Sequence, residues 1–439
     1  MAKTYDTYKD SGIAWIDMIP KGWRALPFKS IFYTEKGLNI TKADLTETGV
    51  PVLSYGQIHS KQNTGTYLNE ELFKFVPRSY LKTNPECLVQ KGCLLIADTS
   101  EDYEGCGNAI YVDSNKTLFA GYHTIIARPY NIGRDYKYFA YLLLTDNWRQ
   151  QVRSCVSGIK VYSVNQKILK QTSVLFPPLP EQEAIATYLD EKCGEIDSLI
   201  SLQEEMISEL QAYKKSVITE AVTKGLDPNV PMKDSGVEWI GMIPEIWKLA
   251  RIGNFFRLRT ERNTKPMEEV QLLSLYTGIG VFPHGEQEER GNKAVTVDGY
   301  KIVHKNDIIV NIILAWMGAI GVSNYDGVTS PAYDIYIPNL ARVVPHYFHY
   351  VFRTKGFAGE CYKYGRGIMM MRWRTYSTEF KQISIPLPPL SEQQTIASYL
   401  DEKTSQIDSL IAIKQEKITK LKDYKKSIIY EYVTGKKKV

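Results

Sequence analysis

Cysteine and histidine are scarce in this chain, with six of each among 439 residues. The cysteines form no C-x-x-C pair, so we expect reduced structural thiols and no zinc site or disulfide framework. His346 and His349 are three residues apart, but no Asp, Glu or Cys lies in the residues next to them. The sequence therefore predicts no metal centre. The six cysteines are Cys87, Cys93, Cys106, Cys155, Cys193 and Cys361.

Long hydrophobic runs are also lacking. No stretch approaches the roughly 18 apolar residues of a membrane-spanning helix, and the opening MAKTYDTYKD has no apolar signal-peptide core. The apolar fraction of 44% and the charged fraction of 23% are ordinary for globular proteins. We expect a cytoplasmic protein that is long enough for two or three domains.

Familiar catalytic motifs are missing. There is no G-x-x-x-x-G-K-[ST] loop, and the three G-x-G pairs lack the third glycine and the βαβ context of a dinucleotide site. No Asn-Pro-Pro-Tyr-like tetrapeptide marks an adenine methyltransferase. From the motifs alone we predict no catalytic residue in this chain.

What the sequence does contain is a long internal repeat. Residues 177–223 recur at 388–434 with 28 of 47 positions identical, and Lys9 to Trp23 recurs as Lys233 to Trp247. The chain is thus two copies of one unit, and the part between the repeats is 13 residues shorter in the second copy. The predicted segments are 1–25, 26–176, 177–225, 226–249, 250–387 and 388–435.

The longer repeat predicts a helix of about 43 residues, or roughly 65 Å. Its apolar residues alternate at spacings of four and three, as in a coiled coil. Ser391 with Gln394 resembles a capping box, while Gly225 and Gly435 are stop signals. The predicted seam of the first copy is Ile185, Leu189, Lys192, Ile196, Leu199, Gln203, Met206, Leu210, Tyr213 and Val217. That of the second is Ile396, Leu400, Lys403, Ile407, Leu410, Lys414, Lys417, Leu421, Tyr424 and Ile428.

Charge supports pairing of the two helices with each other. Residues 180–224 carry 4 basic against 10 acidic side chains, and residues 391–439 carry 10 against 7. Opposite net charge and a shared apolar stripe favour an antiparallel pair within one chain, related by a pseudo-twofold axis. Solvated charged faces are the alternative explanation of the charge pattern.

The segments between the repeats read as mixed α/β modules, which makes the fold class α+β. Short β-type runs such as PVLSYGQI, CLLIAD and YDIYIP alternate with turns, and a helical stretch is expected at 136–152 and at 346–359. Residues 26–176 hold 17 basic against 13 acidic side chains, and residues 250–387 hold 17 against 12. Both modules are therefore net positive and suited to an anionic partner.

One dense acidic loop contains Asp98, Glu101, Asp102 and Glu104, as a metal nuclease would need. The corresponding stretch of the second copy, residues 312–317, is apolar. A site that belongs to the repeating unit should occur in both copies, so we favour a solvated loop.

Two motifs, D-S-G-x-x-W-I-x-x-I-P-x-x-W and P-P-L-x-E-Q-x-x-I-A-x-Y-L-D-x-K, each occur twice and in the same order. In this the chain resembles the DNA specificity subunit of type I restriction-modification systems. The resemblance implies two target recognition domains, each reading half of a bipartite double-stranded DNA site. It also implies that the helices set the spacer and dock two methyltransferase subunits.

The same resemblance assigns the chemistry to partners. Methyltransferase subunits would bring S-adenosylmethionine, and two restriction subunits would bring ATP and Mg-dependent steps. This chain would have no cofactor of its own. Which bases are read, how long the spacer is and whether a nuclease subunit belongs to the complex are not encoded in any motif.

Candidate base-reading or phosphate-binding residues lie in the polar and aromatic loops of both modules. Arg366, Arg372 and Arg374 are the sharpest choices because arginine can pair bidentately with guanine, with phosphate contact or an internal ion pair as the alternative. The candidates in the first module are Gln57, Thr99, Ser100, Tyr122, His123, Lys160, Tyr162 and Asn165. Those in the second are Thr277, Trp316, Tyr333, Arg366, Arg372 and Arg374.

Two other functions remain open on the sequence. One is a stand-alone DNA methyltransferase or nuclease with a divergent site, which would modify or cut DNA without partners. The other is a coiled-coil scaffold that binds only proteins, which would give an assembly without sequence preference.

Overall fold

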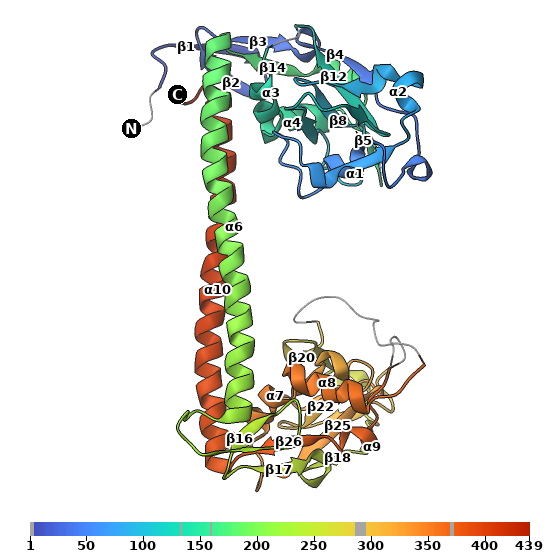
Figure 1. The fold of residues 1–439 in the computed structure, drawn as a ribbon, viewed down its shortest axis with the longest axis vertical. Helices are drawn as coiled ribbons and strands as arrows, with labels where there is room; N and C mark the ends of the chain where they lie inside the picture. The colour runs from blue at the N-terminus through green and yellow to red at the C-terminus, as the bar shows by residue number, and fades with distance from the viewer. Residues whose placement is uncertain (1–3, 132–133, 159, 286–295, 369–372) are drawn as a thin grey trace. The chain divides into compact units, whose positions relative to one another are not determined.

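The computed structural model describes residues 4–131, 134–158, 160–285, 296–368 and 373–439. It divides into two units (Figure 1). Unit 1 comprises Met1–Gln203 and Glu416–Val439, and unit 2 comprises Glu204–Gln415. The two long helices, α6 (Leu179–Lys224) and α10 (Leu390–Val433), each contribute residues to both units.

Unit 1 contains fourteen strands among its described residues, most of them short. The strands are β1 (Tyr8–Ile13), β2 (Ile16–Pro20), β3 (Arg24–Pro27), β4 (Phe32–Lys36), β5 (Val50–Leu53), β6 (Lys74–Val76), β7 (Leu88–Val89), β8 (Leu94–Ala97), β9 (Thr99–Ser100), β10 (Ala109–Tyr111), β11 (Leu118–Ala120), β12 (Thr124–Pro129), β13 (Tyr162–Ser163) and β14 (Ser173–Phe176). The helices are α1 (Tyr55–Ile58), α2 (Tyr80–Thr83), α3 (Lys137–Leu143), α4 (Asp146–Arg153) and α5 (Gln166–Gln171), with 3-10 turns η1 (Phe28–Ser30), η2 (Lys42–Asp44), η3 (Glu70–Leu72) and η4 (Pro85–Cys87).

Two four-stranded sheets form the module of unit 1. One has the order β10-β8-β12-β4 and is antiparallel throughout. The other has the order β6-β5-β11-β7, in which β11 runs parallel to β5. All four residues of β8 are buried, as expected for the run CLLIAD, because both faces of this strand are covered. The aromatic face of α3 packs on the same core, with Phe139 fully buried.

Unit 2 has one four-stranded sheet among its described residues, and its other strands pair in twos. Its strands are β15 (Met232–Asp234), β16 (Met242–Pro244), β17 (Lys248–Arg251), β18 (Phe256–Leu258), β19 (Leu273–Tyr276), β20 (Gly280–Pro283), β21 (Lys301–Val303), β22 (Ile308–Asn311), β23 (Ile320–Val322), β24 (Gly327–Thr329), β25 (Tyr333–Pro338) and β26 (Ser384–Leu387). The helices are α7 (Pro345–Val351), α8 (Lys355–Tyr364) and α9 (Ser377–Phe380), with 3-10 turns η5 (Ile252–Asn254), η6 (Met267–Glu269) and η7 (Ala315–Met317). The sheet β18-β25-β22-β23 packs against α7 and α8 through one apolar cluster.

The structure corrects two sequence-based expectations about the modules. The run PVLSYGQI is not one strand, because β5 ends at Leu53 and residues 55–58 form α1, whose first turn is closed by the Ser54–Gln57 capping box. The helical stretch expected at 136–152 is two helices, since the side chain of Thr145 caps α4. Thr354 divides α7 from α8 in the same way.

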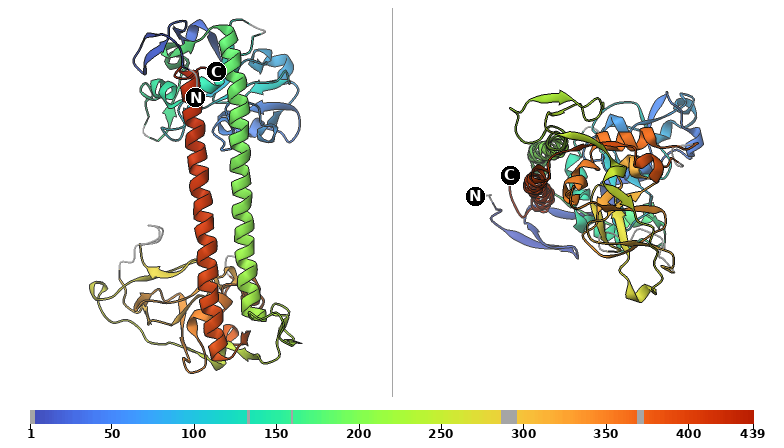
Figure 2. Two further views of the ribbon diagram at one scale, coloured as in Figure 1. Left: turned by 90° about the vertical axis from the view of Figure 1, so that its left-hand side faces the viewer. Right: turned by 90° about the horizontal axis from the view of Figure 1, so that it is seen from below.

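The long helices run antiparallel within each unit, side by side in the views of Figure 2. In unit 1 the rings of Tyr188 and Tyr432 lie 4.4 Å apart, and Asp197 accepts from Lys425 at 2.6 Å. In unit 2 Lys214 donates to Asp408 at 2.6 Å. Asp197 and Lys214 are the repeat equivalents of Asp408 and Lys425, so the same ion pair is made in both units.

The buried stripe differs from the predicted seam. Leu199, Met206 and Tyr213 are exposed, whereas Cys193 and Ile200 are buried. The two stripes share Ile185, Leu189, Ile196 and Gln203 and differ at the positions between them, and both satisfy four-three spacing. In α10, Leu410 and Tyr424 are likewise exposed. Buried positions of the pair include Ile185, Leu189, Cys193, Ile196, Ile200, Gln203, Ile396, Leu400, Thr404, Ile407, Ile418, Ile428 and Tyr432.

The predicted helix ends are partly confirmed. Gly225 follows α6 with a φ of 79° and Gly435 follows α10 with a φ of 71°, in the left-handed region that favours glycine. Helix α10 begins at Leu390, so Ser391 lies inside the first turn and is not its cap. Gly435 also packs closely on Pro20 and Trp23, and Gly225 on Pro244 and Trp247.

Candidate nucleic-acid interface

The candidates of the first module gather on neighbouring elements. Thr99 and Ser100 form β9, which pairs with β13 so that Tyr162 lies opposite Ser100. His123 contacts Asp98 at 3.0 Å and the Thr99 hydroxyl at 3.3 Å. The structure thus brings together side chains from three separate loops.

Tyr55 connects this group to α1. Its ring meets those of Tyr122 and His123 edge-on, with centroids 5.7 and 5.4 Å apart. Gln57 lies two residues further along α1, and its side-chain oxygen accepts from Ser54 N at 3.0 Å. An aromatic surface surrounded by amide and hydroxyl groups can stack on sugars and hydrogen-bond to bases.

A cavity of about 670 Å³ opens between these loops. Gln57, Ser100 and Tyr122 line it, together with Lys42, Tyr55, His59, Asn108 and Arg149, which the sequence-based set missed. Burial lowers the pKa of Arg149 to about 10, helped by the charge of Arg153. Arg149 comes from α4, about 90 residues after α1, and no local signal in the sequence indicates this proximity.

His59 is held from both sides. Its Nε2 lies 2.8 Å from the Thr99 carbonyl oxygen, and Asn108 lies 3.1 Å from its Nδ1. Nε2–H donates to the Thr99 carbonyl oxygen, and Nδ1 accepts from the Asn108 amide. The ring is therefore fixed, and it is a wall of the cavity.

His123 has a φ of 54°, a left-handed conformation that non-glycine residues rarely adopt. Such strain costs on the order of 1 kcal/mol or more and persists only where neighbouring contacts hold it. Here Asp98 and Thr99 hold the ring at an exposed position. The backbone is shaped around this side chain.

Two candidates already use their polar groups inside the protein. Ser100 is 2% exposed and donates to the Asp102 carbonyl oxygen at 2.7 Å. Asn165 caps α5 by accepting from Ile168 N at 3.0 Å. Lys160, by contrast, is exposed. For these three residues, as for all the other candidates, a role in DNA binding stays a prediction.

Several carboxylates of the acidic loop already contact other groups of the protein. Asp98 contacts His123, Asp102 accepts from Gly105 N at 2.5 Å, and Glu104 lies 3.2 Å from Arg153. Within the described residues no three metal-ligating side chains converge.

The candidates of the second module are more dispersed. Thr277 is exposed in the turn between β19 and β20, and Tyr333 begins β25, where burial raises its pKa. Trp316 lies in η7, donates its indole N–H to the Ile313 carbonyl oxygen at 2.9 Å and meets Tyr362 edge-on.

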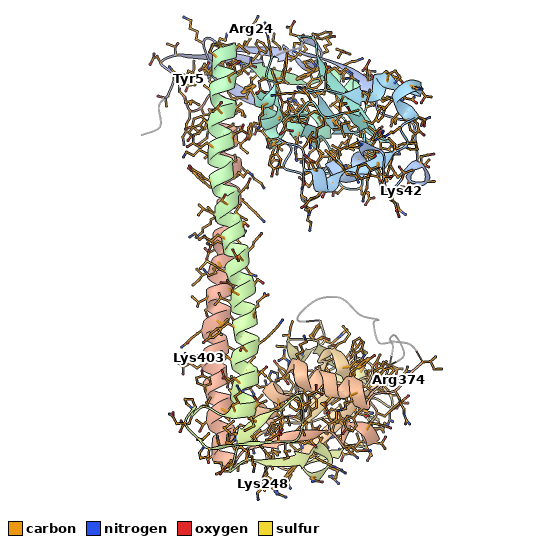
Figure 3. The ribbon with its side chains drawn as sticks, in the orientation of Figure 1. Tyr5, Arg24, Lys42, Lys248, Arg374 and Lys403 are labelled. Atoms are coloured by element: carbon orange, nitrogen blue, oxygen red, sulfur yellow. The ribbon has the colours of Figure 1, made fainter. Side chains whose placement is uncertain are left out.

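Arg366 and Arg374 face each other across an antiparallel bridge, with backbone hydrogen bonds of 2.9 and 3.0 Å. Figure 3 shows Arg374 on the side of unit 2 that is remote from α10. The Arg366 guanidinium lies over the Tyr376 ring at 5.1 Å and 3.3 Å from Glu379, yet its side chain is 68% exposed. Arg372 lies outside the described residues.

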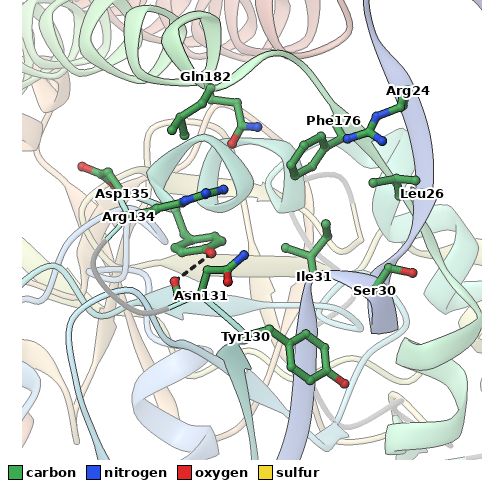
Figure 4. Close-up of a pocket in the computed structure, with 12 residues that line it drawn as sticks. Arg24, Leu26, Ser30, Ile31, Tyr130, Asn131, Arg134, Asp135, Phe176 and Gln182 are labelled. Atoms are coloured by element: carbon green, nitrogen blue, oxygen red, sulfur yellow. Dashed lines mark hydrogen bonds between the residues drawn. The ribbon is translucent and has the colours of Figure 1, made fainter.

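A second basic hollow in unit 1, of about 320 Å³, lies where β14 leads into α6 (Figure 4). The Arg24 guanidinium lies 5.3 Å from the centre of the Phe176 ring, and Arg134 also lines the hollow. No candidate from the sequence lines it. Its residues belong to the join between module and helix.

The repeated motif residues make that join in both units. Trp23 donates to Glu181 at 2.7 Å, and Trp247 donates to Glu392 at 2.9 Å. These bonds attach the short repeat to the first turn of the following long helix. Further matched bonds are Tyr138 to Val433 O and Tyr347 to Val222 O, and Tyr141 to Asp190 and Tyr350 to Asp401.

Comparison with known proteins identifies this architecture. The statistical model of the type I restriction modification DNA specificity domain matches the chain twice, at residues 20–212 and 244–423, which is most of its length. The chain belongs to this family. It is a specificity subunit of a type I restriction-modification system, with two DNA-recognition modules.

Relatives of the subunit include two from Methanocaldococcus jannaschii. One, assigned as the MjaX type I restriction enzyme specificity subunit, is 25% identical over 97% of this chain and 96% of its own. The MjaVIII specificity subunit is also 25% identical, over 66% of this chain and 67% of its own. The EcoBI specificity subunit of Escherichia coli is 22% identical over 65% of this chain and 62% of its own.

Solved structures share the fold. The HsdS subunit from Thermoanaerobacter tengcongensis aligns with a TM-score of 0.54 at 16% identity, over 95% of this chain and 98% of that one. A chain from a study of type I R-M complex assembly aligns with a TM-score of 0.67 at 15% identity, over 95% and 99%. The predicted α+β class with two modules and two long helices is confirmed. Across the described residues no helix has the length and apolarity needed to span a bilayer.

Proposed function

We propose that each module reads one half of a bipartite, asymmetric site in double-stranded DNA. One observation carries this proposal. The bonds that join module to helix are the same in both units, whereas the loop residues differ, with Gln57, Tyr122 and His123 in one module and Thr277, Trp316 and Arg366 in the other. Two modules that are joined to the helices in the same way but have different loop residues are suited to two different half-sites.

The subunit supplies the address and no chemistry of its own. The matched family is a DNA specificity family and not a catalytic one. In this proposal two methyltransferase subunits dock on the long helices and bring S-adenosylmethionine, and two restriction subunits bring ATP and Mg-dependent cleavage. The complex would act on DNA in the cytoplasm.

Exchange of one module tests the proposal. Residues 26–176 are replaced by the corresponding module of another specificity subunit, and the exchanged chain is expressed with its methyltransferase partner. Sequencing of methylated DNA should show a change in one half-site only. A change in both half-sites, or in neither, would overturn the assignment of one half-site to each module.

The two other functions give different results. A stand-alone methyltransferase or nuclease would modify or cleave DNA as the purified chain with S-adenosylmethionine, ATP and Mg²⁺ added. A protein-only scaffold would support assembly with a methyltransferase but leave methylation without sequence preference. We expect neither outcome.

A further inference from the structure

A cavity of about 700 Å³ in unit 2 lies where the second module meets the long helices, and we call it the junction pocket. Lys214 and Lys215 of α6 and Asp408 of α10 form one wall. His349 of α7, Arg353 in the turn that follows α7, and the turn at Thr277 form the other. In Figure 1, α7 lies beside the helix pair of this unit.

The junction pocket holds more positive than negative charge. Asp408 is taken by Lys214 at 2.6 Å, and Asp401 of α10 accepts from His346 at 2.7 Å and from Tyr350 at 2.6 Å. Both nearby carboxylates are therefore engaged. The exposed Lys215 has no ion pair among the described residues.

Arg353 is a half-buried cation without a carboxylate. Its guanidinium donates to the carbonyl oxygens of Gly278 and Ile279 and to Nε2 of His349, at 2.6 Å for the last. Arginine has five N–H donors, so two stay without an acceptor in the part of the chain that the structure describes. Burial lowers the pKa of Arg353 and lowers that of His349 to about 3, so His349 is a neutral acceptor here.

Unit 1 lacks this arrangement. Alignment of Tyr138-Phe139 with Tyr347-Phe348 places Ala140 at the position of His349 and Leu144 at that of Arg353. Leu144 packs on Gly65, so an apolar contact stands where unit 2 has its guanidinium. Arg353 is therefore specific to the second unit, whereas Lys214 and Lys215 recur in unit 1 as Lys425 and Lys426.

We propose that the junction pocket binds a phosphate of the DNA backbone through Arg353 and Lys215. A guanidinium and an ammonium next to an open cavity suit a phosphate oxygen, and Thr277, a candidate base-reading residue, lies on the same rim. DNA read by that turn would bring its phosphates within reach. This inference rests on the proposed function, and it makes the long helix a direct DNA contact in unit 2.

Salt dependence of DNA binding is the test, because each phosphate contact adds about 0.9 to the slope of log K against log salt. The variants are Arg353→Leu, which copies the unit 1 residue, and Lys215→Gln at an exposed position. Lys426→Gln, the unit 1 equivalent of Lys215, is the matched control. The probes are a duplex with the mapped site and duplexes with either half-site scrambled, bound by the full chain with its methyltransferase partner.

We expect each pocket variant to reduce the slope by about one and to weaken binding about fivefold at 0.15 M salt, equally on all duplexes. The methylated sequence should not change, and Lys426→Gln should keep the original slope. Lys215→Gln decides the question if Arg353→Leu does not fold. An unchanged slope for Lys215→Gln, or a changed half-site, would overturn the inference.

Two further outcomes separate other causes. If the wild-type complex shows no site preference, the proposed function itself is contradicted. If the preference is preserved and the salt slopes of the pocket variants do not change, only the phosphate contact is contradicted. Inorganic phosphate at about 10 mM should raise the melting temperature of the wild type and of Arg353→Leu equally. If it stabilises only the wild type and the slopes do not change, the pocket binds a small free anion, contrary to our assignment.

Discussion

At the scale of single residues, Arg366 combines structural and recognition features. Its contacts with Tyr376 and Glu379 orient the guanidinium, while most of the side chain is open to solvent. An exposed ion pair contributes about 0–1 kcal/mol to stability. A bidentate contact with guanine contributes about 1–3 kcal/mol of discrimination. The two roles therefore differ in the quantity that mutation changes.

We expect Arg366→Ala to relax specificity at one base of one half-site by roughly tenfold, with less than about 1 kcal/mol lost from the free energy of unfolding. Sequencing of methylated DNA and thermal unfolding measure the two effects. Arg366→Lys is the control, since it keeps the charge but not the fork. Equal weakening on every sequence would instead identify Arg366 as a phosphate contact.

His349 should make the free energy of unfolding depend on pH. Burial and the Arg353 charge hold its folded-state pKa at about 3, below the unfolded value near 6.5. The unfolded chain therefore binds a proton first as pH falls. Between pH 6.5 and 5 the free energy of unfolding should decrease by up to about 1.4 kcal/mol per pH unit, less where solvent reaches the ring.

Chemical denaturation of wild type and His349→Gln across this pH range measures the effect. Glutamine keeps an acceptor for Arg353 but does not titrate, so its unfolding free energy should depend less steeply on pH. The same slope in both proteins would show that other groups are responsible.

At the scale of elements, mutations in the helix pair can show which of two apolar stripes is buried. Ile200 is 9% exposed and its neighbour Leu199 is 44% exposed. Ile200→Ala should lower the free energy of unfolding by about 2–5 kcal/mol, because it removes buried methyl groups and leaves a cavity. Leu199→Ala should change it by less than about 1 kcal/mol. A larger loss for Leu199 in denaturant titrations would restore the seam read from the sequence.

The sequence predicted the elements whose signals are local. Repeats located both long helices, and Gly225 and Gly435 located their ends. The predicted seam of α6 was right at positions such as Leu189 and Ile196 but wrong at Leu199 and Tyr213, because four-three spacing alone allows either of two neighbouring positions to be buried. The helices at 136–152 were merged because the capping role of Thr145 depends on a bend that no apolar period reveals.

The candidate site was predictable only in part, and the reason is distance along the chain. Thr99, Tyr122 and Tyr162 were chosen for their residue type and do lie on adjoining elements. Arg149 and Tyr55 were missed because their contribution arises when α4 and α1 fold against the same loops. The asymmetry at Arg353 also needed the structure, since its neighbours come from α6, α7 and a distant turn.

At the scale of the whole molecule, the length of the helices becomes a variable that can be changed. Insertion of seven residues near Glu204 in α6 and at the equivalent Gln415 in α10 keeps the four-three phase. Seven residues at 1.5 Å add about 10 Å, the rise of about 3 base pairs. We expect the spacer between the half-sites to lengthen by about that amount in sequenced methylated DNA, with both half-sites unchanged.

Insertion of seven residues in α6 alone is the control, because it shifts one helix against the other and should destabilise the pair. A spacer that stays the same in the doubly extended chain would contradict a role for the helices as a ruler.

Unit 1 is built from two separate stretches of the chain, and this affects the order in which the units can fold during synthesis. Unit 2 is continuous, from Glu204 to Gln415, whereas unit 1 needs Glu416–Val439 as well as Met1–Gln203. The first module leaves the ribosome early. Tyr138 can donate to Val433 O, and Trp23 can pack on Gly435, only after the end of the chain has been synthesised. Domains usually mature in the order of synthesis. Unit 1 is therefore synthesised first but completed last. A chain that ends before Glu416 contains all of unit 2 but only part of unit 1.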